Sequence, residues 1–501
     1  MIRIEHEQNP DVLRQVALLL ERENRHLHER IEALTREIAR LKGADATALQ
    51  LEIEQLRELL ARREQSIFGA SSEKRPHKPA AAPPEPAPQT GHGPTAQPEL
   101  PVVEELYELP ADQRTCPTCS GTLEPMGEQA EESEEISVVQ RRFVVVERRR
   151  QKYRCRCNAA VVTAPAPPKL IPGGRYAPEF AAEVAVSKYL DHLPLERQSR
   201  IMGRQGLEVT SQTLWDQVDA LARVLGPSYE ALHPHVLAAP VVHADETHWR
   251  LMTRQGSSRW WVWSVANREA VFYRLCGTRS QKAARRILTG YQGVVMCDGY
   301  TAYQTLARAG PGFTLAHCWA HVRRKFVEAE PNYPAECEPM LAWIGALFAV
   351  EREVPFGPVA ESPEVLELRR RLRDERSRPL LAQIYDRATE RKGQVLPRSG
   401  LGRALHYLLA HWPGLTRFLD DPRIPLDNNL AERELRGVVL GRKNHYGSRS
   451  KRGTEVAAVL YSLLETAKLA GVDPYQYLLR ATWAALDRPG TVLLPHQLDS
   501  N

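Results

Sequence analysis

A repeat of apolar residues with a period of seven runs along the start of the chain. Leucines recur from Leu13 to Leu41 at one position of the repeat, and a second apolar position is interrupted by Asn24. Such a pattern without Gly or Pro predicts a coiled coil, and a single core Asn favours two strands. An amphipathic helix packed on its own protein gives the same pattern. We interpret residues 1–66 as a coiled coil that forms a homo-oligomer, and the Pro- and Ala-rich residues 67–105 as an extended linker.

A helical pattern covers residues 171–235. Within it, residues 193–218 have the form helix, Gly turn, helix. Gly206 suits a left-handed turn, and Thr210 or Ser211 suits the N-cap of the second helix. This pattern predicts a helix-turn-helix-like DNA-binding region, although plain helical packing produces it as well.

From Pro240 onward the pattern changes to short apolar runs that predict strands. Three runs separated by polar turns predict an antiparallel meander over residues 240–277. A helix, two strands and a second helix are then predicted at residues 281–288, 293–300, 313–318 and 319–329. We expect a multidomain protein with an α/β domain at 236–447, a helical insertion within it at about 330–410, and a C-terminal helical segment at 448–501.

Four of the eight cysteines form two close pairs, Cys116 with Cys119 and Cys155 with Cys157. Four thiolates in two pairs can close a tetrahedral zinc site. The second spacing, C-x-C, is tighter than the usual C-x-x-C, and four unrelated reduced thiols are the alternative. We interpret residues 106–170 as a zinc-ribbon-like module that binds Zn²⁺.

The overall composition limits the class of protein. Lys and Arg number 67 against 62 Asp and Glu, a mildly basic balance that is compatible with nucleic acid without indicating it alone. Hydrophobic residues make up 43% of the chain, which excludes a wholly disordered protein. The longest obvious apolar run, residues 341–350, is about half a membrane span. The N-terminal residues lack the order of a signal peptide, so we expect a cytosolic protein without a membrane segment.

Three carboxylates occupy positions from which they can converge. Asp245 lies in the first predicted strand, Asp298 ends the fourth, and Glu432 lies in the first turns of a late helix. A meander followed by β/α units, with acids in this order, is the layout of the RNase H-like fold. Carboxylates on adjacent strands and a covering helix can hold two divalent cations, Mg²⁺ or Mn²⁺, which clamp the attacking and leaving oxygens of a phosphodiester.

Each of these acids also has a simpler explanation. Asp245 could merely end a strand, and its neighbour Glu246, on the opposite face, competes for the metal role. Asp298 is followed by a glycine, and this pair is typical of turns. Glu432 lies three residues after Asn429, a spacing that also fits a capping box. The order and strand context of the three acids favour the metal site.

Five motifs around these acids carry a resemblance to a known family. They are ADETHW (Ala244–Trp249), CDGYTAY (Cys297–Tyr303), HCWAHVRRKF (His317–Phe326), DNNLAERELR (Asp427–Arg436) and GRKNHYGS (Gly441–Ser448). The chain resembles, over nearly its whole length, the large transposase of the IS66 (IS-sixty-six) family of bacterial insertion sequences. The resemblance implies that Asp245, Asp298 and Glu432 are the catalytic acids of a DDE-type transposase. It also implies a helical insertion among the 133 residues between Asp298 and Glu432.

The resemblance further implies a reaction and its partners. The expected reaction is hydrolysis at the ends of the element, followed by transesterification into target DNA. The expected partners are double-stranded DNA and small accessory proteins of the same element, in the bacterial cytoplasm at the nucleoid. Two other classes of protein compete with this interpretation: a non-catalytic, zinc-containing DNA-binding regulator, and an inactive remnant held together by its coiled coil. The nearest enzymatic alternative is a metal-dependent DNA nuclease without strand transfer.

Basic residues beside the motifs are predicted to contact DNA phosphates. The predicted DNA-binding residues are Arg323, Arg324, Lys325, Arg433, Arg436, Arg442, Lys443 and Arg449. Residues 433–452 hold seven basic groups and one acid, with glycines at positions 441 and 447 that allow close approach of a backbone. A solvated basic loop is the alternative interpretation of this segment.

A last group of residues has the composition of a metal site. His317, Cys318 and His321 lie close together in the sequence where the fifth predicted strand meets a helix. We expect them to pack at this junction and not to bind a second metal.

Overall fold

The computed structural model describes most of the chain beyond residue 142 and parts of the N-terminal region. The described residues are 10–38, 52–53, 56–60, 110, 117–118, 122, 143–154, 161–253, 256–310, 312–355 and 358–498. Two compact units are present, one formed by Phe68–Arg142 and the other by the rest of the chain. The predicted linker at 67–105 and the predicted zinc ligands Cys116, Cys119, Cys155 and Cys157 lie outside the described residues. No helix in the described ranges is long and apolar enough to cross a membrane.

The N-terminal helix α1 spans Pro10–Ile38 and confirms a helix in the heptad region. Leu34 is buried, and Oδ1 of Asn24 is shielded from solvent without a hydrogen-bond partner among the described residues. A second helix in a coiled coil would supply such a partner. Pairing of two copies through α1 stays a prediction.

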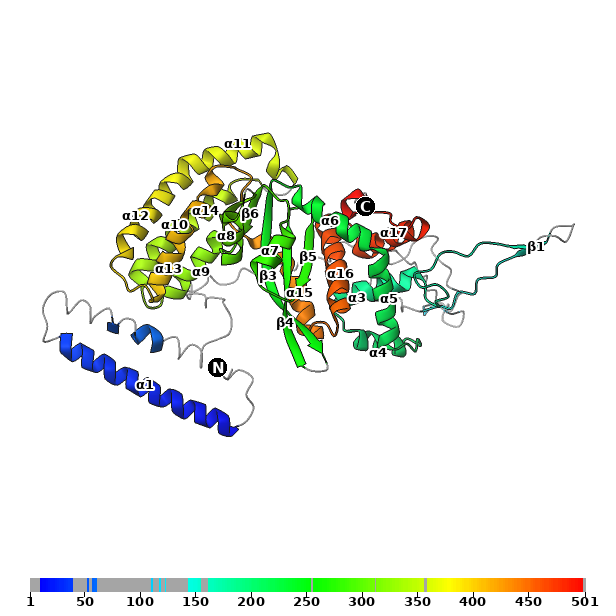
Figure 1. The fold of residues 1–501 in the computed structure, drawn as a ribbon, viewed down its shortest axis with the longest axis horizontal. Helices are drawn as coiled ribbons and strands as arrows, with labels where there is room; N and C mark the ends of the chain where they lie inside the picture. The colour runs from blue at the N-terminus through cyan, green and yellow to red at the C-terminus, as the bar shows by residue number, and fades with distance from the viewer. Residues whose placement is uncertain are drawn as a thin grey trace. The chain divides into compact units, whose positions relative to one another are not determined.

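The larger unit is built on a five-stranded sheet (Figure 1). Its strands are β3 (Val241–Thr253), β4 (Gly256–Ala266), β5 (Val271–Cys276), β6 (Val294–Cys297) and β7 (Thr314–His317). Their order in the sheet is β5-β4-β3-β6-β7. The first three strands form an antiparallel meander, and β6 and β7 run parallel to β3. The predicted meander and the two later strands are thus confirmed.

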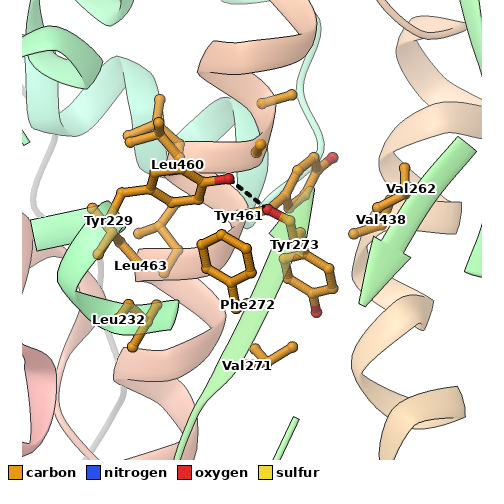
Figure 2. Packing of buried hydrophobic residues seen from close by; sticks show 14 of the residues in the cluster. Tyr229, Leu232, Val262, Val271, Phe272, Tyr273, Val438, Leu460, Tyr461 and Leu463 are labelled. Atoms are coloured by element: carbon orange, nitrogen blue, oxygen red, sulfur yellow. Dashed lines mark hydrogen bonds between the residues drawn. The ribbon is translucent and has the colours of Figure 1, made fainter. Parts of the chain in front are cut away.

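Helices cover the sheet and complete its edge. α15 (Asn429–His445) packs against β3 and β4, and α16 (Lys451–Leu469) packs against the edge strand β5. Ser462 Oγ of α16 accepts the Tyr273 N–H at 2.9 Å, and Thr466 Oγ1 accepts the Val271 N–H at 3.1 Å. These hydroxyls satisfy backbone donors that have no neighbouring strand. Figure 2 shows the apolar packing around β5 and α16.

The segment between β7 and α15 is helical and spans the residues of the predicted insertion, about 330–410. Its helices are α9 (Trp319–Ala329), α10 (Pro334–Arg352), α11 (Pro363–Leu372), α12 (Arg378–Lys392), α13 (Gly400–Ala410) and α14 (Trp412–Leu415). All of these helices except α11 contribute to a buried core of their own, which includes Met296 of β6 and Ala316 of β7. Within it, α13 packs against α9 and α14 packs against β7. The insertion is therefore anchored to the parallel half of the sheet.

The remaining elements surround this framework. They are the strand pair β1 (Lys152–Arg154) and β2 (Val161–Thr163), and the helices α3 (Pro178–Tyr189), α4 (Leu195–Arg204), α5 (Ser211–Val224), α6 (Gly226–Leu237), α7 (Gln281–Ile287), α8 (Thr301–Arg308) and α17 (Pro474–Asp487). The turn between α4 and α5 has Gly206 at φ +85°, and Thr210 Oγ1 accepts the Thr213 N–H at 3.1 Å. The predicted turn and N-cap are confirmed, while DNA binding by this region stays a prediction.

Candidate active site

The sheet register brings two of the three predicted acids side by side. The parallel pairing of β3 with β6 ends at His243 opposite Met296. Asp245 lies two residues after His243 in β3, and Asp298 lies two residues after Met296, directly after β6. Because parallel strands advance together, these carboxylates occupy neighbouring positions just beyond the last β3–β6 pair, where β6 ends.

Asp245 lies in an environment that disfavours its charge. Burial, followed by the nearby carboxylates of Glu246, Asp298 and Glu432, raises the pKa of Asp245 to about 8. The Glu246 N–H donates to Asp245 Oδ1 at 2.8 Å and partly opposes this shift. The three predicted acids therefore form one electrostatically coupled group, and a bound cation would relieve their repulsion.

Asp298 also makes a turn, as its sequence context suggested. Its Oδ1 accepts the Tyr300 N–H at 2.9 Å, and Gly299 has φ +87°. A Cβ at Gly299 would lie 2.6 Å from His411 Nε2, so only glycine fits this turn. The turn holds Asp298 beside Asp245, and the two interpretations of this residue are compatible.

The helical insertion braces the Asp298 turn. Tyr407 of α13 donates a hydrogen bond from its hydroxyl to the Asp298 carbonyl oxygen. Gln304 of α8 donates to the Gly299 carbonyl at 3.3 Å and lies 2.8 Å from His411 Nε2. The insertion thus helps fix the backbone that carries Asp298.

The start of α15 places Glu432. Asn428, fully buried, donates from Nδ2 to the Ala244 carbonyl at 3.0 Å, one residue before Asp245. Asn429 Nδ2 donates a hydrogen bond to Asp427 Oδ2 at 2.8 Å. The N-cap of α15 is Asn428, and its side chain makes no capping hydrogen bond. The capping-box interpretation of Glu432 is therefore wrong, and its carboxylate is available for other contacts.

The Glu432 carboxylate faces α9. His321 Nε2 lies 3.7 Å from Glu432 Oε1, and Arg324 Nη2 lies 3.9 Å from Oε2. Cys318 Sγ belongs to the same cluster, in which the potential ligand atoms lie within 4.8 Å of one another. Burial raises the pKa of the Cys318 thiol to about 12, and its sulfur accepts the Asn428 N–H at 3.2 Å. Cys318 therefore connects the starts of α9 and α15 as a neutral thiol.

Glu246 has partners of its own. Arg279 Nε donates to Glu246 Oε1 at 2.8 Å, and Tyr303 Oη donates to Oε2 at 3.0 Å. The Arg279 guanidinium also lies over the rings of Tyr300 and Trp261, at 4.0 and 4.9 Å from their centroids. Because both carboxylate oxygens of Glu246 are occupied, it competes poorly with Asp245 for a cation.

The predicted DNA-binding residues divide into three groups. Arg324 lies beside Glu432, and Lys325 Nζ lies 5.0 Å from the ring centroid of Tyr407. Arg324 is exposed, and so are five others: Arg323, Arg433, Arg436, Lys443 and Arg449. Arg442 differs, because it is partly buried and donates to Thr247 Oγ1 at 3.1 Å and to the His248 carbonyl. Its guanidinium connects α15 to β3.

The basic segment, residues 433–452, is helical up to His445, the last residue of α15, so a basic loop, the alternative interpretation, does not describe its first part. Gly447 follows at φ +118°, where a Cβ would overlap the Arg250 carbonyl oxygen. A Cβ at Gly441 would overlap the Tyr461 hydroxyl. Gly447 packs against the Arg250 backbone and Gly441 against the Tyr461 side chain, so both glycines permit close packing within the protein. Close approach to a phosphate stays a prediction.

Two residues beside the acids were underestimated from the sequence. The sequence indicates no contact between Asn428 and a strand, and for His321 it predicts only packing at a junction. A signal for His321 existed: it follows β7, as Asp298 follows β6, and the ends of neighbouring parallel strands share one edge. Its value depends on strand order, which the sequence does not state.

Comparison with known proteins identifies the family. The model of the transposase IS66 family matches residues 173–456, which include the three acids. The model of the zinc-finger binding domain of transposase IS66 matches residues 113–158, which include the four paired cysteines.

Three relatives come from Sinorhizobium fredii (strain NBRC 101917 / NGR234). "Uncharacterized protein y4jD" is 36% identical over 386 residues, covering 73% of this chain and 74% of the relative. "Uncharacterized protein y4hP" is 31% identical over 407 residues, covering 76% of this chain and 72% of the relative. "Uncharacterized protein y4qI" is 31% identical over 515 residues, covering 93% and 92%. The chain described here belongs to the transposase IS66 family.

Proposed function

We propose that this transposase is a DDE-type enzyme with an RNase H-like catalytic domain. The observation that carries the proposal is the placement of Asp245 and Asp298 two residues beyond the last β3–β6 pair, with Glu432 of α15 near enough to raise the pKa of Asp245. The meander followed by two parallel strands supports the fold assignment. The proposed reaction is hydrolysis at the ends of an insertion sequence, followed by transesterification of the freed ends into target DNA.

The three acids fit divalent cations such as Mg²⁺ or Mn²⁺. Oε1 of Glu432 is buried without a hydrogen-bond partner among the described residues, and carboxylate oxygens are the ligands that these ions prefer. Asp245, Asp298 and Glu432 would hold the ions. When bound, they supply the charge that activates an attacking hydroxyl and stabilises a leaving oxygen.

Other side chains orient this group. Asn428 ties the start of α15 to β3, and Tyr407 fixes the Asp298 backbone. Arg324 lies beside Glu432, and Lys325 lies over the ring of Tyr407. Both cations can therefore neutralise a DNA phosphate near the acids.

The proposed DNA surface extends from this site. It comprises the two residues just named and the exposed Arg323, Arg433, Arg436, Lys443 and Arg449. Arg442 is left out because its guanidinium is used within the fold. In the helix-turn-helix-like region we favour α4, which exposes Arg197, Arg200 and Arg204, over α5, which exposes the acidic Asp216.

The N-terminal modules complete the proposal. The zinc-finger match supports Zn²⁺ binding by the four paired cysteines. The heptad pattern and the unpartnered Asn24 Oδ1 support a homo-oligomer through α1. Because its substrate is DNA, the enzyme would act in the bacterial cytoplasm. Small accessory proteins of the element would act with it, as the family resemblance implies.

End cleavage tests the catalytic assignment. Full-length protein is incubated with Mg²⁺ and a duplex carrying the inverted repeat that flanks the gene. Asp298→Asn should abolish cleavage while a gel shift still shows DNA binding, because the amide keeps the shape and loses the charge. Asp386→Asn, at an exposed position of α12, is the matched control and should cleave normally. Cleavage by Asp298→Asn within a few-fold of wild type would make the assignment wrong.

A further inference from the structure

The contacts of Glu432 leave a gap between two potential ligands. The His321 Nε2 to Glu432 Oε1 distance of 3.7 Å is longer than a hydrogen bond. Glu432 Oε1 and His321 Nδ1 are both buried without a hydrogen-bond partner among the described residues. Buried polar atoms usually have partners, so the carboxylate oxygen Oε1, which lies nearest to His321 Nε2, calls for an additional group.

The geometry suits a shared cation. Two donors separated by 3.7 Å are close enough for both to bind one cation, because metal–ligand bonds are about 2.1 Å long. Arg324 Nη2 is 3.9 Å from the other carboxylate oxygen and is 44% exposed, so it leaves Oε1 free. Cys318 Sγ, although near, is fully buried and accepts the Asn428 N–H. The available donors are one imidazole nitrogen and one carboxylate oxygen.

Two structural features hold His321 in this place. It lies in the first turn of α9, directly after β7, whose neighbour β6 leads to Asp298. The Asn428 N–H to Cys318 Sγ contact fixes the start of α15 against the start of α9. Because His321 and Glu432 each lie about one turn from this contact, they face each other across the two helices.

We propose that His321 supplies a nitrogen ligand to the divalent cation held by Glu432, and that this half of the site therefore prefers a first-row transition metal such as Mn²⁺ to Mg²⁺. Mg²⁺ favours all-oxygen coordination, whereas imidazole suits transition metals. The inference rests on the proposed function in one respect, the assignment of Glu432 as a metal-holding acid.

Manganese binding tests the inference without an activity assay. The full-length chain is titrated with Mn²⁺ by electron paramagnetic resonance, and pulsed measurements detect coupling to a directly bound ¹⁴N nucleus. Wild type should show ¹⁴N coupling. His321→Gln should lose the coupling and bind Mn²⁺ about tenfold or more weakly, while Mg²⁺ affinity from competition changes by less than about threefold.

Two further variants make the result specific. His406→Gln, at an exposed position of α13, is the histidine control and should match wild type. His321→Asp replaces nitrogen by oxygen, so it should lose ¹⁴N coupling and shift the preference toward Mg²⁺. This variant also serves if His321→Gln does not fold, as judged by circular dichroism.

The outcomes separate this inference from the proposed function. Absence of ¹⁴N coupling in wild type, or its persistence in His321→Gln, would overturn the role of His321. If Asp298→Asn and Glu432→Gln both remove Mn²⁺ binding while His321→Gln changes nothing, only this inference is wrong. If Glu432→Gln and Asp298→Asn bind Mn²⁺ as wild type does, the metal assignment in the proposed function is wrong as well.

Discussion

Replacing Asp245 with Asn should stabilise the protein when no Mg²⁺ or Mn²⁺ is present. Burial and neighbouring carboxylates raise the pKa of Asp245 from 3.8 to about 8 in the folded protein. At pH 7 the unfolded chain has lost this proton and the folded chain keeps it. Folding must therefore include the uptake of a proton. This costs about 1.4 kcal/mol for each of the roughly three pH units between the ordinary pKa and pH 7, or about 4 kcal/mol in total. Residual solvent contact makes this an upper figure, so we expect a gain of about 2 to 4 kcal/mol for Asp245→Asn.

The pH dependence has a definite sign. Between pH 4 and 8 Asp245 holds its proton more fully in the folded protein than in the unfolded chain, so the contribution of Asp245 to the stability of wild type falls as pH rises. Asp245→Asn removes this fall. Its advantage should be absent near pH 4, grow up to about pH 8 and then level off. Adding Mg²⁺ should reverse the order, because only wild type gains stability from binding the ion at this carboxylate.

Thermal and urea unfolding, followed by circular dichroism at pH 4.5, 7 and 8, measure this difference. Asp386→Asn is the control and should follow wild type at each pH. The reasoning is refuted if Asp245→Asn is no more stable than wild type at pH 7 without divalent ions. It is equally refuted if the difference between the two proteins does not change with pH.

Three other predictions concern separate parts of the chain. Glu432→Gln should melt close to wild type and lose cleavage in a duplex assay with Mg²⁺. Glu434→Gln should cleave normally and melt at the same or a higher temperature, since burial raises the pKa of Glu434; the opposite pattern would move the third ligand to Glu434. Metal analysis should find one zinc per chain, lost on substitution of the paired cysteines. Deletion of residues 1–66 should lower the mass found by light scattering, whereas Asn24→Leu should keep the association; an unchanged mass after deletion would place oligomerisation elsewhere.

Much of the fold could be predicted from local patterns. The strands around Asp245 and Asp298 were predictable because apolar runs between polar turns reflect burial on a sheet. The helical insertion followed from the spacing between Asp298 and Glu432 together with the family resemblance. The chemistry of the three acids followed from their order along the chain.

What could not be predicted depends on contacts between distant residues. The hydrogen bond from Arg279 to Glu246 joins residues 33 positions apart, and the hydrogen bond from Asn428 to the Ala244 carbonyl joins residues 184 positions apart. Periodicity reports which face of an element is buried, and it contains no information on such partners. The place of His321 required the strand order, and the capping-box interpretation of Glu432 failed because the side chain of Asn429 turned to Asp427.

The central claim is that the three coupled carboxylates join DNA as well as cut it. A duplex with a pre-formed 3′-hydroxyl end of the element, incubated with full-length protein, Mg²⁺ or Mn²⁺ and a circular plasmid, tests this directly. We predict covalent joining of the labelled end to the plasmid by wild type, and none by Asp298→Asn at equal DNA binding. Efficient cutting by wild type without any joined product would instead indicate a nuclease, and joining by Asp298→Asn would contradict the account of the site.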